Sequence, residues 1–275
     1  MVIALAGFVT FGALPAAANS DNVQYVALGD SYAAGVGAPP ADPNDPCKQS
    51  DFGYPGVLDS GKRIVLQVNA TCAGATTTYV ANHLPPGLNP ETRLVTLTVG
   101  GNDLGFAGLA GACLAGTPED CLKAIGAAEG KLTGLRSDLT KLYLEVAEAA
   151  PDARIVVTGY PFLVEPSNAT IVTAFRAATV RLNDTIEQAV AAAREADVKI
   201  VYVDVTEEFA GHGIVDPRSC TGAFIHCLFI DGDPNKPDQE AFHPNAAGYR
   251  AYADAIFDVL PVGWLDKTSG VAASS

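Results

Sequence analysis

The stretch VQYVALGDSYAAG, residues 23–35, joins a strand-like run to a glycine-containing turn. Its first half, Val23–Leu28, is rich in apolar, β-branched and aromatic side chains, which predicts a buried strand. Gly29 and Asp30 interrupt the run and place Ser31 in a sharp turn. Taken alone, a serine at such a turn is best explained as the N-cap of a helix. The stretch therefore predicts a strand that gives way to a glycine-flanked turn, which can expose the hydroxyl of Ser31.

Similar apolar runs alternate with helical stretches along the rest of the chain. The expected strands are Val23–Leu28, Ile64–Ala70, Arg93–Val99, Arg154–Gly159 and Lys199–Val205. The expected helices are Thr76–Asn82, Pro118–Ala150, Ala169–Ala196 and Asn245–Val259. Thr117 can cap the second of these helices and Asn245 the last. Strands that alternate with helices predict an α/β protein whose five-stranded parallel sheet is covered on both faces.

The chain of 275 residues is long enough for one domain with a substantial core. We expect that domain over residues 22–262 and a flexible tail over 263–275. Residues 1–18, MVIALAGFVTFGALPAAA, form an apolar run that ends in small residues, as secretory signals do. The basic stretch that normally precedes such a run is missing, which is consistent with a truncated start. The run is shorter than the roughly 20 residues that span a bilayer. We therefore expect a secreted, extracellular protein without stable membrane insertion.

The composition narrows the choice of partner. Hydrophobic residues make up 48% of the chain and charged residues 17%, which is typical of a globular protein. The formal net charge is −14, and no basic patch is evident in the sequence. Contacts to phosphate need such patches, so nucleic acid is not an expected partner. The sequence does not indicate an oligomeric state.

Six cysteines agree with export, because disulfides persist in oxidising compartments. They allow many pairings, and sequence alone does not choose among them. We expect sequential pairing, which closes three short loops: Cys47–Cys72, Cys113–Cys121 and Cys220–Cys227. No cluster of cysteines and histidines has the spacing of metal ligands, so no metal is expected.

Polar residues and glycines follow the first three expected strands at their carboxyl ends. Ser31 follows the first strand, Gly74 the second and Asn102 the third, while His243 precedes the last helix. In parallel sheets ligands bind outside this edge. A serine hydroxyl becomes a good nucleophile when a neighbouring base takes its proton. The four residues therefore predict a nucleophile and a base at one edge of the sheet.

His243 is the expected base among four histidines. His83 precedes two prolines and is interpreted as a surface residue, His212 lies in a glycine-flanked loop, and His226 lies between two cysteines. For His243 the alternative is a structural role at the start of a helix.

Three groups could orient the ring of His243. Glu240, three residues earlier, is the expected third catalytic residue, because an acid performs this task in serine triads. A backbone carbonyl near Ala241 is the second possibility and Asp238 the third. All three remain open at this point.

Three donors are expected for an oxyanion: the backbone N–H groups of Ser31 and Gly74 and the side-chain amide of Asn102. Gly74 could instead be an ordinary turn glycine, and Asn102 could belong only to a tight turn after a strand. Asp30 is expected to fix the turn rather than to transfer protons.

Four segments carry a family resemblance: GDSYAAGVG from Gly29, CAGAT from Cys72, VGGND from Val99 and FHPN from Phe242. In these the chain resembles the SGNH (GDSL-type) hydrolases, especially the secreted esterases and lipases of actinobacteria. The resemblance implies a three-layer, flavodoxin-like fold, three disulfides, no metal and no cofactor. It also implies Ser31 as nucleophile, Gly74 and Asn102 as oxyanion donors, and His243 as base. The family usually has aspartate where this chain has Glu240, and some relatives use a main-chain carbonyl instead.

We therefore predict a secreted carboxylic ester hydrolase that acts on a small-molecule or lipid ester. A polysaccharide O-acetyl esterase and an acyltransferase are the alternatives on the same machinery, and a non-catalytic binding domain is a third. The apolar stretches Phe106–Leu114 and Pro161–Val164 follow two strands and are interpreted as loops that line an acyl pocket or pack in the core.

Overall fold

The structure of the protein, a computed structural model, describes residues 22–38, 44–60, 63–216, 219–227, 238 and 240–264. Its centre is a sheet of five strands in which all neighbours are parallel. The strands are β1 (Val23–Gly29), β2 (Ile64–Thr71), β3 (Leu94–Thr98), β4 (Arg154–Thr158) and β5 (Ile200–Val203). The predicted parallel sheet is confirmed. The expected signal segment, 1–18, and residues 265–275 of the expected tail lie outside the described residues.

The strand order is β2-β1-β3-β4-β5, the flavodoxin-like order. The chain passes from β1 to β2 on one side and then returns to place β3 on the other side of β1. In the register, Tyr25 of β1 aligns with Leu94 of β3, which aligns with Arg154 of β4. Ligands bind where the strand order changes direction. This point lies at the carboxyl end of β1, directly before Ser31.

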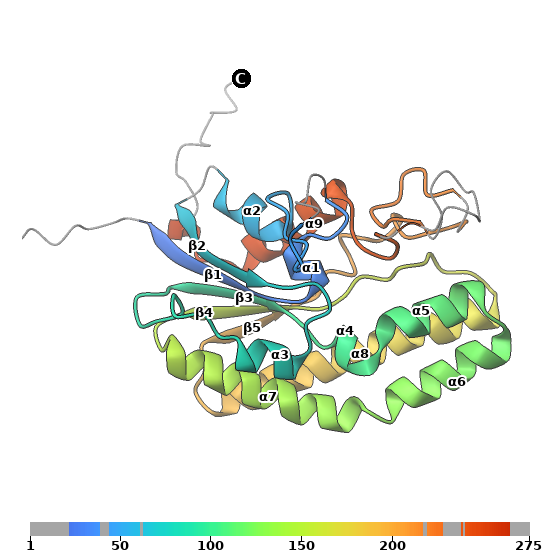
Figure 1. The fold of residues 1–275 in the computed structure, drawn as a ribbon, viewed down its shortest axis with the longest axis horizontal. Coiled ribbons are helices and arrows are strands. Elements are labelled where there is room, and N and C mark those ends of the chain that lie inside the picture. Colours follow the sequence, from blue (N-terminus) through green and yellow to red (C-terminus); the bar gives the residue numbers. More distant parts are fainter. Residues whose placement is uncertain are drawn as a thin grey trace, which may run out of the picture.

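Helices cover both faces of the sheet. They are α1 (Ser31–Ala34), α2 (Tyr54–Asp59), α3 (Thr77–Asn82), α4 (Gly101–Leu104), α5 (Phe106–Ala115), α6 (Pro118–Glu129), α7 (Leu132–Ala149), α8 (Thr170–Glu195) and α9 (Ala246–Val259), followed by a short 3-10 helix, Val262–Trp264. Figure 1 shows α2 and α9 on one face and α3, α7 and α8 on the other. All five residues of β3 are buried between these layers. A strand that is covered on both faces reads as a continuous apolar run, and this explains the strand-like stretches of the sequence.

Side-chain caps fix two of the predicted helix starts. Thr117 Oγ1 accepts a hydrogen bond from Asp120 N, and Asp120 Oδ2 accepts one from Thr117 N, both at 3.2 Å. At the last helix, Asn245 Oδ1 accepts from Ala247 N at 2.9 Å and from Gly248 N at 3.1 Å. These contacts satisfy amides that have no partner within the helix. Both predicted caps are confirmed.

Two expectations about helices are wrong. The single helix expected over Pro118–Ala150 is two helices, α6 and α7, which separate at Gly130 and Lys131. Glycine has a low helix propensity and weakens the helix at this point. The apolar stretch from Phe106, interpreted as a loop, is the helix α5. The short helices α1, α2 and α4 were also not predicted, because pieces of four to six residues carry little periodicity.

Gly29 allows the strand ends to approach each other at the switch point. Its φ is +133°, and a Cβ at this position would lie 2.3 Å from Thr98 O of β3. The next residue, Asp30, donates its N–H to the same Thr98 O at 2.8 Å. Only glycine fits this close approach, so the sharp turn before Ser31 depends on it.

Three disulfides join the cysteines in sequential order, Cys47–Cys72, Cys113–Cys121 and Cys220–Cys227. The first ties the segment after α1 to the end of β2, and the second joins α5 to α6. The third closes a loop that precedes the segment with His243. Among the described helices, none combines the length and apolar character that a membrane span requires.

Candidate active site

Ser31 is the first residue of α1 and begins the helix directly after β1. Asp30 is the N-cap, and its Oδ1 accepts a hydrogen bond from Tyr32 N at 2.9 Å. Ser31 is 9% exposed, so its hydroxyl lies near the surface but is screened from most of the solvent. No hydrogen bond within the described residues uses the Ser31 N–H, which leaves this donor free at the helix start.

His243 brings a base to this hydroxyl. Its Nε2 lies 2.7 Å from Ser31 Oγ, and its Nδ1 lies 3.0 Å from Ala241 O and 3.3 Å from Glu240 O. Carbonyl oxygens only accept hydrogen bonds, so Nδ1 carries the ring proton and Nε2 accepts from the serine. The expected pairing of Ser31 with His243 is therefore present in the geometry.

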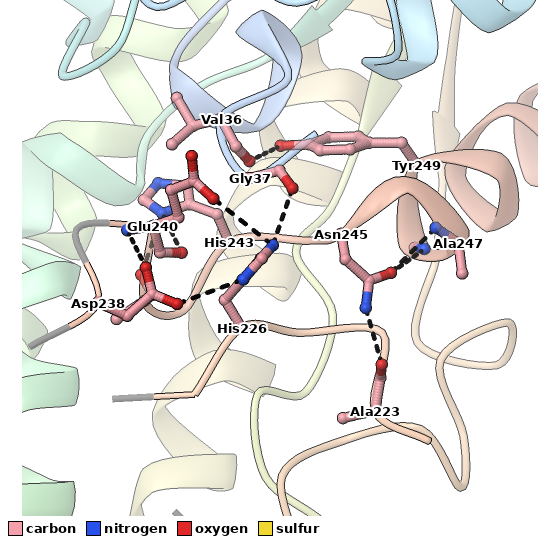
Figure 2. Close-up of polar contacts among 12 residues, drawn as sticks. Val36, Gly37, Ala223, His226, Asp238, Glu240, His243, Asn245, Ala247 and Tyr249 are labelled. Carbon is pink, nitrogen blue, oxygen red and sulfur yellow. Dashed lines mark hydrogen bonds and ion pairs between the residues drawn. The ribbon is translucent and has the colours of Figure 1, made fainter. Parts of the chain in front are cut away.

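The Glu240 side chain does not take the expected position beside His243. Its Oε2 lies 3.9 Å from His226 Nε2, and the side chain is half exposed. Figure 2 shows the carboxylates of Glu240 and Asp238 directed at His226. Main-chain carbonyls of residues 240 and 241 occupy the place of a triad carboxylate, because the tight turn before His243 folds them under the ring. The expected contact of the Glu240 carboxylate with His243 is therefore wrong.

Burial tunes two titratable groups at the site. It lowers the pKa of His243 to about 4, and the hydrogen bonds to Glu240 O and Ala241 O oppose this shift. The ring is therefore neutral at ordinary pH and able to accept a proton. Burial also raises the pKa of Asp30 to about 7, against the hydrogen bonds that it accepts from Tyr160 and Tyr32.

Asn102 lies on the short helix α4 after β3 and faces the same space as Ser31. Its Nδ2 donates to Ala75 O at 2.9 Å, which leaves the second hydrogen of the amide available. Its neighbour Asp103 accepts a hydrogen bond from Thr77 Oγ1 at 2.6 Å and further bonds from Thr77 N. These contacts bind α4, after β3, to α3 and to the turn before it, after β2.

Gly74 lies on the exposed turn that follows β2. Its N–H has no hydrogen-bond partner among the described residues, and it is not among the residues that line the cavity beside Ser31. The bond from Asn102 Nδ2 to Ala75 O nevertheless holds this turn next to Asn102. The structure thus brings Ser31, Asn102 and His243 to one cavity and leaves Gly74 outside its lining.

A cavity of about 60 Å³ lies beside Ser31 and His243. Part of its lining consists of the polar groups described above. The apolar part of the lining comes mainly from α5 and the segment after β4: Phe106, Ala107, Ala110 and Leu163, together with Phe242. The two stretches expected to line an acyl pocket thus both contribute to it, although one is helical.

Three further contacts join the segment that follows Ser31 (residues 32–37) to the part of the chain around His243 (residues 226–249). Tyr32 Oη donates to Phe242 O at 2.5 Å, and Tyr249 Oη donates to Val36 O at 2.7 Å. His226 Nε2 lies 2.8 Å from Gly37 O (Figure 2). A Cβ on Gly37 would lie 2.5 Å from Pro244 O, so the two loops touch at their backbones.

His226 also belongs to the site, although its sequence position predicted only a disulfide loop. Its main chain donates to His243 O at 2.9 Å and accepts from Phe242 N at 3.1 Å, and it pairs the disulfide loop with the histidine loop. No sequence signal marks this pairing. His83 stacks on Tyr79 and His212 on Phe224, so neither competes as the base.

One group of described side chains has ligand atoms close enough to share a metal ion. The ligand atoms of His226, Asp238 and Glu240 lie within 4.8 Å of one another. His226 Nε2 faces Gly37 O and its Nδ1 lies 3.4 Å from Asp238 Oδ2, so both nitrogens already have oxygen partners. These contacts connect the two loops. All six cysteines are in disulfides, and none offers a thiolate ligand.

A buried serine hydroxyl bonded to a neutral imidazole, beside an apolar cavity at the carboxyl edge of a parallel sheet, is the arrangement of a serine ester hydrolase. The chain belongs to the GDSL-like lipase/acylhydrolase family, whose model matches residues 27–251. This confirms the resemblance drawn from the four sequence segments, and it makes the chain a carboxylic ester hydrolase.

Individual relatives are similar over most of the chain. A lipase of Streptomyces rimosus is 35% identical over 248 residues, which cover 86% of this chain and 87% of the lipase. Among solved structures, an extracellular lipase of Streptomyces rimosus has a TM-score of 0.72 at 30% identity and covers 86% of this chain and 100% of its own. A phospholipase A1 of Streptomyces albidoflavus has a TM-score of 0.74 at 29% identity, with coverages of 86% and 99%.

Proposed function

We propose that the chain hydrolyses carboxylic esters through an acyl-enzyme on Ser31, with His243 as the general base. The observation that carries this proposal is the 2.7 Å contact between Ser31 Oγ and His243 Nε2. A base within hydrogen-bond reach is what a serine nucleophile requires.

In the proposed reaction, Nε2 of His243 takes the hydroxyl proton while Oγ of Ser31 attacks the acyl carbon. The negative charge that develops on the carbonyl oxygen is stabilised by the N–H of Ser31 and the amide of Asn102, which line the cavity. The N–H of Gly74, on the turn that Asn102 binds through Ala75 O, is the third donor of the proposal. The imidazolium then donates its proton to the alcohol oxygen as the C–O bond breaks. Water attacks the acyl-enzyme with His243 again as base, and the carboxylic acid leaves.

Main-chain carbonyls replace a carboxylate as the partner of Nδ1 in this proposal. Ala241 O and Glu240 O hold the Nδ1–H tautomer and face the ring when it becomes positively charged. A carbonyl dipole stabilises an imidazolium less than a full negative charge does, so His243 keeps a low pKa. The ring therefore returns its proton readily to the leaving alcohol.

We propose a lipid ester as the substrate class. The apolar wall formed by Phe106, Ala107, Ala110 and Leu163 offers an acyl chain a place beside the reacting carbonyl. The relatives named lipase and phospholipase A1 support this choice.

Hydrolysis of p-nitrophenyl esters from acetate to palmitate tests both proposals. For Ser31→Ala and His243→Ala we expect kcat to fall by more than about 10³-fold, because residues that act as a unit lose their effect together. Ser50→Ala is the matched control, since Ser50 is also buried and its hydroxyl accepts a hydrogen bond from Phe52 N. Turnover that persists in Ser31→Ala contradicts the mechanism, and activity confined to acetate contradicts the lipid substrate.

We also propose that the protein is exported. Its three disulfides support this, as does the similar extracellular lipase of Streptomyces rimosus. Expression of the full chain in an actinobacterial host should place it in the medium, with a mass that corresponds to cleavage near Ala18. Full-length protein retained in the cells contradicts the proposal.

A further inference from the structure

We propose that Tyr160 is a positioning residue that sets the distance between the nucleophile and the Asn102 oxyanion donor. The inference rests on the proposed function and adds a residue outside the four sequence segments. Tyr160 directly follows Gly159 at the end of β4 and is 4% exposed. It lies between the turn that carries Ser31, after β1, and the turn that carries Asn102, after β3.

The hydroxyl of Tyr160 connects these two turns. Gly101 N donates to Tyr160 Oη at 3.0 Å, and Tyr160 Oη donates to Asp30 Oδ2 at 2.5 Å. Gly101 immediately precedes Asn102, and Asp30 immediately precedes Ser31. Tyr160 Oη therefore binds both the residue directly before the nucleophile and the residue directly before the oxyanion donor.

The two turns need such a connection because neither can hold its own position. Ser31 opens α1 and Asn102 lies in α4, and each of these helices has only four residues. A single helical turn has little stability by itself and depends on tertiary contacts. The direction of the Ser31 hydroxyl and of the Asn102 amide is therefore set by what the two turns bind.

The donor and acceptor arrangement gives the hydroxyl one orientation. The N–H of Gly101 occupies the oxygen of Tyr160, so the hydroxyl proton is directed at Asp30. The second oxygen of Asp30 accepts from Tyr32 N. Each group in this series of hydrogen bonds, from Gly101 N through Tyr160 Oη and Asp30 to Tyr32 N, thus has a defined role as donor or acceptor. Rotation of the Tyr160 hydroxyl or of the Asp30 carboxylate breaks a hydrogen bond.

Tyr160 is itself rigidly held. Its N–H donates to Asn183 Oδ1 at 2.9 Å, and Asn183 Nδ2 donates to Tyr160 O at 2.8 Å. Asn183 belongs to α8 and is 7% exposed. The ring packs edge-on against Tyr32, with centroids 5.1 Å apart, and a Cβ on Gly101 would lie 3.2 Å from its Cζ. A residue that positions others must have locked rotamers, and these contacts supply them.

Tyr160→Phe removes only the hydroxyl that makes the connection. The matched control is Tyr25→Phe, because Tyr25 is also a fully buried tyrosine. Its hydroxyl, on β1, bonds to one side chain, Thr96 Oγ1 on the neighbouring strand β3, at 2.6 Å. Both variants lose a buried hydroxyl and should melt at a lower temperature, Tyr160→Phe at a lower one than Tyr25→Phe because it breaks two hydrogen bonds, one of them to the Asp30 carboxylate. A role in stability alone would lower the melting temperature of both variants and leave kcat unchanged in both.

The expected result for Tyr160→Phe with p-nitrophenyl butyrate is a fall in kcat of roughly 10- to 100-fold with KM changed less than about threefold, since a shift of about 1 Å in a reacting group can cost this much. For Tyr25→Phe, kcat should stay within about twofold of wild type. Unchanged kcat in Tyr160→Phe overturns the inference. So does a raised KM with unchanged kcat, which would make Tyr160 a wall of the cavity only.

Failure of this inference can be told apart from failure of the proposed function. If Ser31→Ala is inactive and Tyr160→Phe is fully active, only the role of Tyr160 is lost. If Ser31→Ala is active, the proposed mechanism is lost. Should Tyr160→Phe not fold, Asn183→Ala gives the second test, because it loosens the Tyr160 backbone from α8. A fall in kcat without a rise in KM supports positioning, and unchanged kcat opposes it.

Discussion

His243 binds the serine hydroxyl through one ring nitrogen and two main-chain carbonyls through the other. At the scale of the residue, this arrangement provides a base that is neutral over a wide pH range. Its low pKa comes from burial, which outweighs the hydrogen bonds to the main-chain carbonyls of Glu240 and Ala241. Asp30, the residue before Ser31, has a raised pKa because burial disfavours its charged form. The two groups therefore take up a proton at different pH values.

The rate should fall in two steps as the pH is lowered. A protonated Asp30, with its pKa of about 7, is a weaker acceptor for the Tyr160 hydroxyl, so the first step is shallow, less than about tenfold. The second step is complete and lies near pH 4, because only neutral His243 can take the serine proton. The measurement is kcat/KM for p-nitrophenyl butyrate between pH 3.5 and 9, with circular dichroism at each pH to show that the fold persists.

Tyr160→Phe is the control for the first step, since it has no hydroxyl to bind Asp30. This variant should show the fall near pH 4 alone. A wild-type rate that falls to zero in one step near pH 6.5, the ordinary value for histidine, contradicts the effect of burial on His243.

Glu240→Gln tests the main-chain partner of His243. The carboxylate of Glu240 lies near His226, so removing its charge should change kcat by less than about threefold, whereas loss of the acid from a serine triad costs about 10⁴-fold. Steady-state kinetics with the same ester measure the difference. A loss of more than about 10²-fold would restore Glu240 as the third catalytic residue.

At the scale of the element, the helix α5 shapes the cavity beside Ser31 and His243, which is the proposed acyl pocket. The helix contains Gly108 and Gly111, and its face toward the core includes Leu109 and Ala110. Its low intrinsic propensity is offset by packing and by the disulfide from Cys113 to α6. As a helix it presents only one face to the cavity, which a loop would not guarantee.

Ala110→Leu should shorten the acyl chains that the enzyme accepts. Ala110 lines the cavity and is fully buried, so the larger side chain fills the space beside the acyl group. We expect kcat/KM for palmitate esters to fall at least about tenfold relative to butyrate, with a stability cost of about 1–3 kcal/mol. Ala112→Leu, on the same helix but not in the cavity lining, should keep the wild-type profile. Identical profiles for the two variants contradict the assignment of the cavity.

At the scale of the whole molecule, the strand order creates the site. Because β1 lies between β2 and β3, the segments that follow these three strands begin side by side, and α9 brings His243 back to them. The disulfide between Cys47 and Cys72 then joins the segment after α1 to the end of β2. It stabilises the same edge of the sheet that carries the site.

Replacing Cys47 and Cys72 by serine should lower the free energy of unfolding by about 3 kcal/mol, since the bridge closes the longest loop of the three, with a separation of 25 residues. The corresponding change at Cys113 and Cys121, separated by 8 residues, should cost about 2 kcal/mol. Melting temperatures of the two double variants, with and without reductant, measure these differences. Equal values for wild type and the first variant contradict the contribution of the bridge.

The strands, the caps at Thr117 and Asn245, and the placement of Ser31, Gly74, Asn102 and His243 after the right elements could all be predicted from the sequence. Each depends on short-range rules: an apolar run bounded by glycine, or a polar side chain at a helix start. The main-chain partners of His243, the helix α5 and the roles of Tyr32, Tyr160 and His226 were decided by the tertiary structure. Contacts of Tyr32, Tyr160 and His226 join residues 130 to 210 positions apart, such as Tyr160 with Asp30 and Tyr32 with Phe242. No local pattern encodes these distances, because they arise only when the sheet brings its strand ends together.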